Sequence, residues 1–219
     1  MKNKKTIYHF IIDKSGSMSG MEQQAVSGFN TQLATLQELK QTYPEQEFKV
    51  SLTYFNHHVQ DIILNGSVDQ ILPMDPRTFD PGGSTALLDA IGKSIYQLKS
   101  DFETELKKDE ATVVMVIITD GAENASRLYT YHEVARMIKE LDETGKWTFS
   151  FLGADLDAIH TSQMLNIRKE NVISFSKSNY SGMMNDVSIS IRTYAQSKSH
   201  GNAKNNIFDI FEKKDRRQP

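Results

Sequence analysis

Three short segments of the sequence carry carboxylate or hydroxyl side chains beside glycines. They are Asp13-Lys14-Ser15-Gly16-Ser17, Gly82-Gly83-Ser84-Thr85 and Thr119-Asp120-Gly121. Carboxylate and hydroxyl oxygens are hard donors, and a small hard cation such as Mg²⁺ binds about six oxygens in an octahedral array. If the fold brings the three segments together, they can form a site for a divalent metal. The elements around them decide whether it does.

Strongly apolar runs flank these segments and predict buried β-strands. Thr6–Ile12 is nearly continuously apolar and ends at Asp13, as expected of a strand that is covered on both faces. Thr112–Thr119 is the most hydrophobic segment and predicts a central parallel strand. Only three residues separate Phe48–Phe55 from Val59–Leu64, which favours an antiparallel hairpin. Two further strands are expected at Trp147–Leu152 and Val172–Phe175.

Helices are expected between these strands, because apolar residues there recur three or four positions apart. The expected helices are Met21–Tyr43, about Thr85–Phe102, Tyr131–Glu143 with Gly145 at its end, Leu156–Leu165 and Ser181–Ser197. Strands alternating with helices imply an α/β fold with a mostly parallel sheet, helices on both faces and one antiparallel edge strand. In such sheets ligands bind at the carboxyl ends of the strands, where all three oxygen-bearing segments should emerge.

The three segments together resemble the metal-ion-dependent adhesion site of von Willebrand factor A domains. Asp-x-Ser-x-Ser after a first strand, a Gly-Gly-Ser-Thr loop and a strand ending in Thr-Asp-Gly all occur in the family's order. One segment alone would be a weak signal, because Ser/Gly loops are usually turns and Asp often caps a helix. The alternation of elements from about residue 6 to 198 fits the same Rossmann-like three-layer fold. We therefore expect one domain over residues 1–198 and a polar, loosely ordered tail over residues 199–219.

The resemblance implies one Mg²⁺ or Mn²⁺ at the top of the sheet. Its ligands would be three hydroxyls and two carboxylates: Ser15, Ser17, Thr85, Asp13 and Asp120. The carboxylates would bind the metal directly or through water, depending on conformation. If both act through water, the metal stays electron-poor and favours an anionic ligand, commonly an Asp or Glu of a protein partner in this family. Glu123 and Asn124 lie just beyond Asp120 and are expected on the rim that contacts the partner. The family also implies that the last helix could couple to the metal face.

Composition excludes several other functions. The net charge of −3 gives no basic surface for nucleic acid or an anionic membrane. The absence of cysteine excludes disulfides, thiolate zinc sites and cysteine nucleophiles. No run reaches the roughly 18 apolar residues of a membrane span, and the apolar stretch after Lys5 is too short for a signal peptide. We expect a soluble, cytoplasmic protein, and the composition is compatible with a bacterial or phage source.

Two motifs resemble other kinds of site, a phosphate-binding loop and a transition-metal site, but lack the spacing or geometry that these sites require. Gly92-Lys93-Ser94 resembles the end of a phosphate-binding loop, but Leu87 stands where the first glycine is required. His57 and His58 could suggest a transition-metal site, but neighbours in an extended segment should point in opposite directions. We expect them on the surface of the hairpin.

The expected function is that of a non-enzymatic binding module that captures an acidic side chain of a protein. One alternative is a metal-dependent hydrolase of phosphoester or amide bonds. Against it, no histidine lies near the three segments in sequence to serve as a general base, although the fold could bring a distant one close. A second alternative, by analogy with similar stand-alone bacterial proteins, is a scaffold or adaptor subunit of a chaperone-like ATPase assembly. The partner, the choice between the two metals and the oligomeric state are left open.

Overall fold

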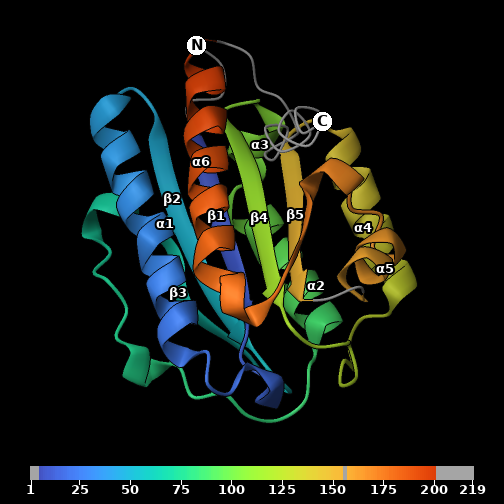
Figure 1. Ribbon diagram of the computed structural model, residues 1–219. Helices are drawn as coiled ribbons and strands as arrows, with labels where there is room; N and C mark the ends of the chain where they lie inside the picture. Colours follow the sequence, from blue (N-terminus) through green and yellow to red (C-terminus); the bar gives the residue numbers. More distant parts are fainter. Residues whose placement is uncertain (1–4, 155–156, 201–219) are drawn as a thin grey trace, which may run out of the picture.

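The computed structural model describes residues 5–154 and 157–200, and this part of the chain forms one six-stranded sheet covered by helices on both faces (Figure 1). The strands are β1 Lys5–Asp13, β2 Glu47–Phe55, β3 Val59–Ser67, β4 Ala111–Thr119, β5 Trp147–Ala154 and β6 Val172–Phe175. Their order across the sheet is β3-β2-β1-β4-β5-β6. All neighbours are parallel except β2 and β3, which form the antiparallel hairpin at one edge.

The strand order reverses between β1 and β4. From β1 the chain first builds outward to β2 and β3, and it then returns to the other side of β1 for β4, β5 and β6. Loops that leave the carboxyl ends of β1 and β4 therefore run in opposite directions, and open α/β sheets bind ligands at such a point. The register pairs Ile12 of β1 with Ile118 of β4, so the two strands end side by side.

Helices cover the two faces in separate groups. Helices α1 (Glu22–Thr42) and α6 (Tyr180–Ser199) lie side by side on one face, and α2 (Leu87–Asp101), α3 (Glu103–Lys107) and α4 (Tyr131–Glu143) cover the other (Figure 1). Helix α5 (Asp157–Met164) packs against β5 and β6. Short 3₁₀ turns stand at Gly16–Met18, directly after β1, and at Lys177–Asn179, directly before α6.

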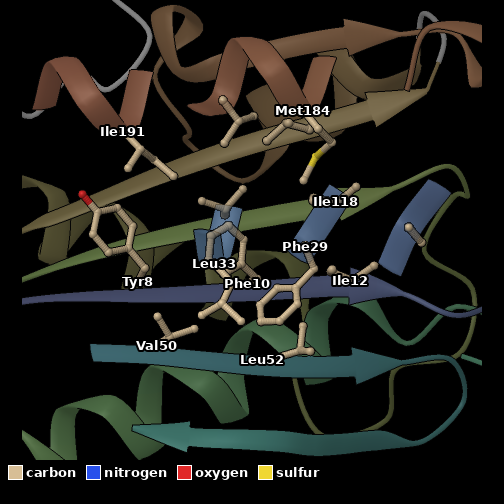
Figure 2. Packing of buried hydrophobic residues seen from close by; sticks show 14 of the residues in the cluster. Tyr8, Phe10, Ile12, Phe29, Leu33, Val50, Leu52, Ile118, Met184 and Ile191 are labelled. Atoms are coloured by element: carbon tan, nitrogen blue, oxygen red, sulfur yellow. The ribbon is translucent and has the colours of Figure 1, made fainter. Parts of the chain in front are cut away.

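Alternate residues of the central strands divide between two cores. Tyr8, Phe10 and Ile12 of β1 face α1 and α6, where Phe29 and Met184 pack against them (Figure 2). The intervening residues of β1 and β4 face α2, α3 and α4. Every residue of β4 is buried. This explains the unbroken apolar sequence, because a parallel strand between two helical layers has no face exposed to water.

The predicted fold class is confirmed: a mostly parallel sheet with one antiparallel edge strand lies between two helical layers. The helix expected from Thr85 begins at Leu87, and the short α3 is an element that the sequence pattern did not reveal. The last helix continues to Ser199, and the expected tail lies outside the described residues beyond position 200. Within the described ranges, none of the helices combines the length and apolarity that a membrane span requires.

Candidate metal centre

Asp13 is the last residue of β1, next to the point where the strand order reverses, and is fully buried. Its Oδ1 accepts a hydrogen bond from the backbone N–H of Ser15 at 2.6 Å. Its Oδ2 accepts one from the hydroxyl of Thr119, the last residue of β4, also at 2.6 Å. Burial raises the pKa of Asp13 above its ordinary value, although the hydrogen bonds from Thr119 and Ser15 oppose the shift. The carboxylate is therefore held in position at the buried base of the candidate site.

The side chains of Ser15, Ser17 and Asp120 form a chain of hydrogen bonds next to Asp13. The Ser17 hydroxyl donates to Asp120 Oδ1 at 2.6 Å. The Ser15 and Ser17 hydroxyl oxygens are 3.0 Å apart. Because the Ser17 proton is directed to Asp120, Ser15 must be the donor in this second contact. The arrangement leaves lone pairs on both hydroxyl oxygens, which is the state in which a hydroxyl can coordinate a cation.

Gly121 marks the point where the three segments converge. A methyl group on Gly121 would lie 3.2 Å from Thr85 Oγ1, 3.3 Å from Ser17 Oγ and 3.7 Å from Asp13 Oδ2. One oxygen from each of two loops and one from the end of β1 thus surround a single small space. Ser15 and Asp120 are hydrogen-bonded to Ser17, and hydroxyl and carboxylate oxygens of this kind match the donor set of a hard divalent cation. The described part of the chain has no cluster of three or more His, Cys, Asp or Glu side chains that could bind a metal. A metal here would therefore depend on the hydroxyls.

Backbone hydrogen bonds hold the loops against one another. Gly16 N–H donates to Gly83 O, and Gly82 N–H donates to Lys14 O, each at 2.9 Å. Gly83 has a φ of +78°, and a side chain there would collide with the ring of His57. Glycine is thus required at this position both by the backbone conformation and by the close approach of the hairpin.

Glu123 and Asn124, the expected rim residues, direct their side chains to backbone groups of the site loops. Glu123 Oε2 accepts from Leu88 N–H in the first turn of α2 at 3.0 Å, and its Oε1 accepts from the N–H groups of Ala125 and Ser126. Asn124 Oδ1 accepts from Thr85 N–H at 2.9 Å. A carboxylate at a helix N-terminus is favoured by the helix dipole. Both side chains therefore position Thr85 and the start of α2.

Two residues of the centre were not among the expected site residues: Thr119, although it belongs to the third oxygen-bearing segment, and Lys177. Thr119 holds Asp13, as described above. Lys177, in the turn before α6, places its Nζ 2.7 Å from Asp120 Oδ2 and donates to Ser17 O at 2.5 Å. The contact with Asp120 is an ion pair outside regular hydrogen-bond geometry. No local signal could have revealed Lys177, because it is 57 positions beyond Asp120 and follows a different strand.

The two histidines of the hairpin do not point in opposite directions, and that expectation is wrong. The ring centroids of His57 and His58 are 4.2 Å apart, because the residues form the bend between β2 and β3 and are not in extended conformation. Both are exposed. The fold also brings the ring of His57 against Gly83, next to one of the three site loops.

Comparison with solved structures identifies the fold. The vWF domain of the type V pili tip protein Mfa5 from Porphyromonas gingivalis aligns with a TM-score of 0.63 and 9% identity over 88% of this chain and 96% of that chain. The manganese-loaded TRAP protein of Plasmodium vivax aligns with a TM-score of 0.57 and 13% identity over 82% and 71%. The fold is that of von Willebrand factor A domains.

A further solved structure that aligns with this chain contains a bound metal. Proximal thread matrix protein 1 from the mussel byssus, with a zinc-occupied metal-ion-dependent adhesion site, aligns with a TM-score of 0.51 and 16% identity over 85% of this chain. The chain spans only 45% of that protein and less than half of several others. No protein-family model and no curated protein sequence matches the chain. At these identities the likeness establishes the fold, and the site must be argued from its own residues.

Proposed function

We propose that the protein is a metal-dependent protein-binding module that captures an acidic side chain of its partner. The observation that carries the proposal is the convergence of Thr85, Ser17 and Asp13 oxygens on the small space at Gly121. Solved structures of the same fold that contain manganese or zinc support a divalent cation at this place. We favour Mg²⁺ or Mn²⁺ for this chain, because its donors are hydroxyls and carboxylates without nitrogen or sulfur.

Each ligand group would have its own part in the centre. Ser15, Ser17 and Thr85 would coordinate through their hydroxyl oxygens. Asp120 would act through Ser17, to which it is already hydrogen-bonded, and Asp13 from the buried base of the site. A cation bound mainly by neutral oxygens keeps much of its charge. It would therefore attract a carboxylate from outside, which suits reversible capture of an Asp or Glu on a protein surface.

We further infer that the site binds without catalysing a reaction. Among the described contacts of the five oxygen-bearing side chains, none involves a histidine that could act as a general base. The hydrolase alternative nevertheless has one observation in its favour, the position of His57 against Gly83. It predicts Mn²⁺-dependent turnover of phosphoester or peptide substrates that is lost in His57→Ala. Turnover of this kind would replace binding as the main function.

The binding function is tested by affinity capture in Mg²⁺ against EDTA. Wild type should retain a defined partner only in Mg²⁺, and Asp13→Ala should lose it. Ser17→Ala serves as a second variant, because Ser17 is exposed and its loss leaves the core intact. Calorimetry with Mn²⁺ alone should show one site per chain in wild type and none in Asp13→Ala. Capture that continues unchanged in EDTA would contradict the proposal.

A further inference from the structure

Lys177 brings a positive charge to the place where the proposed cation would act. Its ammonium lies 2.7 Å from Asp120 Oδ2 and 2.5 Å from the carbonyl oxygen of Ser17, so it contacts residues of two of the three site loops. The Asp120 side chain is only 1% exposed, whereas that of Lys177 is 47% exposed. The lysine therefore reaches in from the surface and covers a buried carboxylate.

The two oxygens of Asp120 have separate partners. Oδ1 accepts the Ser17 hydroxyl at 2.6 Å, which orients Ser17 toward the centre. Oδ2 has the ammonium of Lys177 within 2.7 Å and no hydrogen bond. Oδ1 of Asp120 thus orients the proposed ligand Ser17, and the charge on Oδ2 is neutralised by the ammonium group of Lys177. A second positive charge close to a bound dication would repel it.

The charge balance shows what this lysine changes. Asp13 and Asp120 supply two negative charges, which would cancel those of a divalent cation. Lys177 adds one positive charge, so the loaded centre would carry a net charge of one and would attract an anion more strongly. The same charge would make the cation bind more weakly while the anion is absent. Metal and anion would then bind cooperatively, with a coupling that is equal in both directions.

We propose that Lys177 is a specificity-determining residue that weakens binding of the metal alone and couples it to binding of the partner's carboxylate. The inference rests on the proposed metal centre and adds to it the residue that makes the centre selective for an anion.

The test uses Mn²⁺ as the metal and acetate as the carboxylate probe. Mn²⁺ affinity is measured by calorimetry with and without acetate in wild type, Lys177→Gln and Lys177→Arg. The Gln variant should bind Mn²⁺ alone about 10-fold to 100-fold more tightly than wild type, and acetate should tighten its binding less. The Arg variant keeps the charge and should behave like wild type. Thermal unfolding in EDTA checks that all three proteins fold.

The outcomes separate this inference from the function on which it rests. Equal Mn²⁺ affinities and equal acetate effects in wild type and Lys177→Gln would overturn the role of Lys177 and leave the metal centre intact. Absence of Mn²⁺ binding in both proteins would overturn the metal centre, and this inference with it. Tighter Mn²⁺ binding in Lys177→Gln than in wild type, together with a smaller effect of acetate, would support the inference.

Discussion

The hydroxyl of Thr119 donates a 2.6 Å hydrogen bond to Asp13 Oδ2 and so joins the last residue of β4 to the last residue of β1. The two residues are 106 positions apart in the sequence. Both are buried, so water cannot replace the bond if it is lost. The contact fixes one carboxylate of the candidate centre at the point where the strand order reverses.

Thr119→Val should therefore weaken both the fold and the metal centre. Valine has the shape of threonine but leaves Asp13 Oδ2 without a donor, which costs about 1–3 kcal/mol of unfolding free energy. Loss of a group that orients a ligand typically lowers metal affinity by about 10-fold to 100-fold. Urea unfolding and Mn²⁺ calorimetry measure the two effects. Thr119→Ser retains the hydroxyl and should stay close to wild type in affinity; an equal loss in both variants would show that the hydroxyl is not responsible.

Gly121→Ala should weaken metal binding while every proposed ligand side chain is retained. The added methyl group would lie 3.2 Å from Thr85 Oγ1 and 3.3 Å from Ser17 Oγ, inside the space where the oxygens converge. We expect Mn²⁺ affinity to fall by at least about 10-fold, with a change in stability of about 1 kcal/mol or less. Gly82→Ala is the matched control in a neighbouring site loop, because a methyl group there meets nothing within 4 Å. Equal Mn²⁺ affinity in Gly121→Ala and wild type would place the metal elsewhere.

The sequence was sufficient to predict the site residues that directly follow parallel strands. Asp13 and Asp120 directly follow apolar runs, and parallel strands bring such residues to one edge of a sheet. The first turn of α2 was misplaced for a reason of tertiary structure. Thr85 O accepts from the N–H groups of Asn124 and Ala125, and Thr85 N–H donates to Asn124. The backbone of Thr85 is thus occupied by another loop, and the helix starts two residues later.

Side chains that act across elements could not be predicted from local patterns. Glu123 and Asn124 were expected to face a partner because they are polar loop residues near Asp120. That expectation stays a prediction; in the structure their acceptors bind the N–H groups of Leu88 and Thr85, contacts that depend on how the loop after β4 lies against the start of α2. Lys177 reaches Asp120 from a different strand-to-helix connection. Periodicity predicts which face of an element is buried, but not which polar partner it meets there.

The buried side chain of Gln32 joins α1 to α6, and replacement of Gln32 should destabilise the protein. Gln32 of α1 is fully buried; its Nε2 donates to Met184 O at 2.7 Å, and its Oε1 accepts from the Ser188 hydroxyl at 3.1 Å. Gln32→Ala should lower the unfolding free energy by about 1–3 kcal/mol, because Ser188 loses a partner and a cavity opens. Gln41→Ala, at an exposed position of the same helix, should change it by less than about 0.5 kcal/mol. Equal unfolding midpoints for the two variants in urea would refute the role of Gln32.

Lys198, near the end of α6, should make stability depend on pH in alkaline solution. Its ammonium contacts the hydroxyls of Thr6 and Thr112 and the carbonyl oxygen of Lys5, and burial lowers its pKa from 10.5 to about 7. Between these two values the unfolded chain binds a proton that the folded chain has released. The unfolding free energy therefore gains from this residue as the pH rises from about 7 to 10.5, by up to about 4 kcal/mol at about 1.4 kcal/mol per pKa unit. Below pH 7 both states are protonated, and the residue adds no further slope.

Lys198→Met isolates this contribution, because methionine keeps the length of the side chain and does not titrate. Urea unfolding of both proteins at intervals from pH 6 to pH 10 gives the difference in unfolding free energy at each pH. The difference should be constant below about pH 7 and should then shift steadily in favour of wild type as the pH rises. Other titrating groups, including the buried tyrosines, cancel in the difference because they are common to both proteins. A difference that is independent of pH over the whole range would mean that Lys198 titrates alike in the folded and unfolded chain.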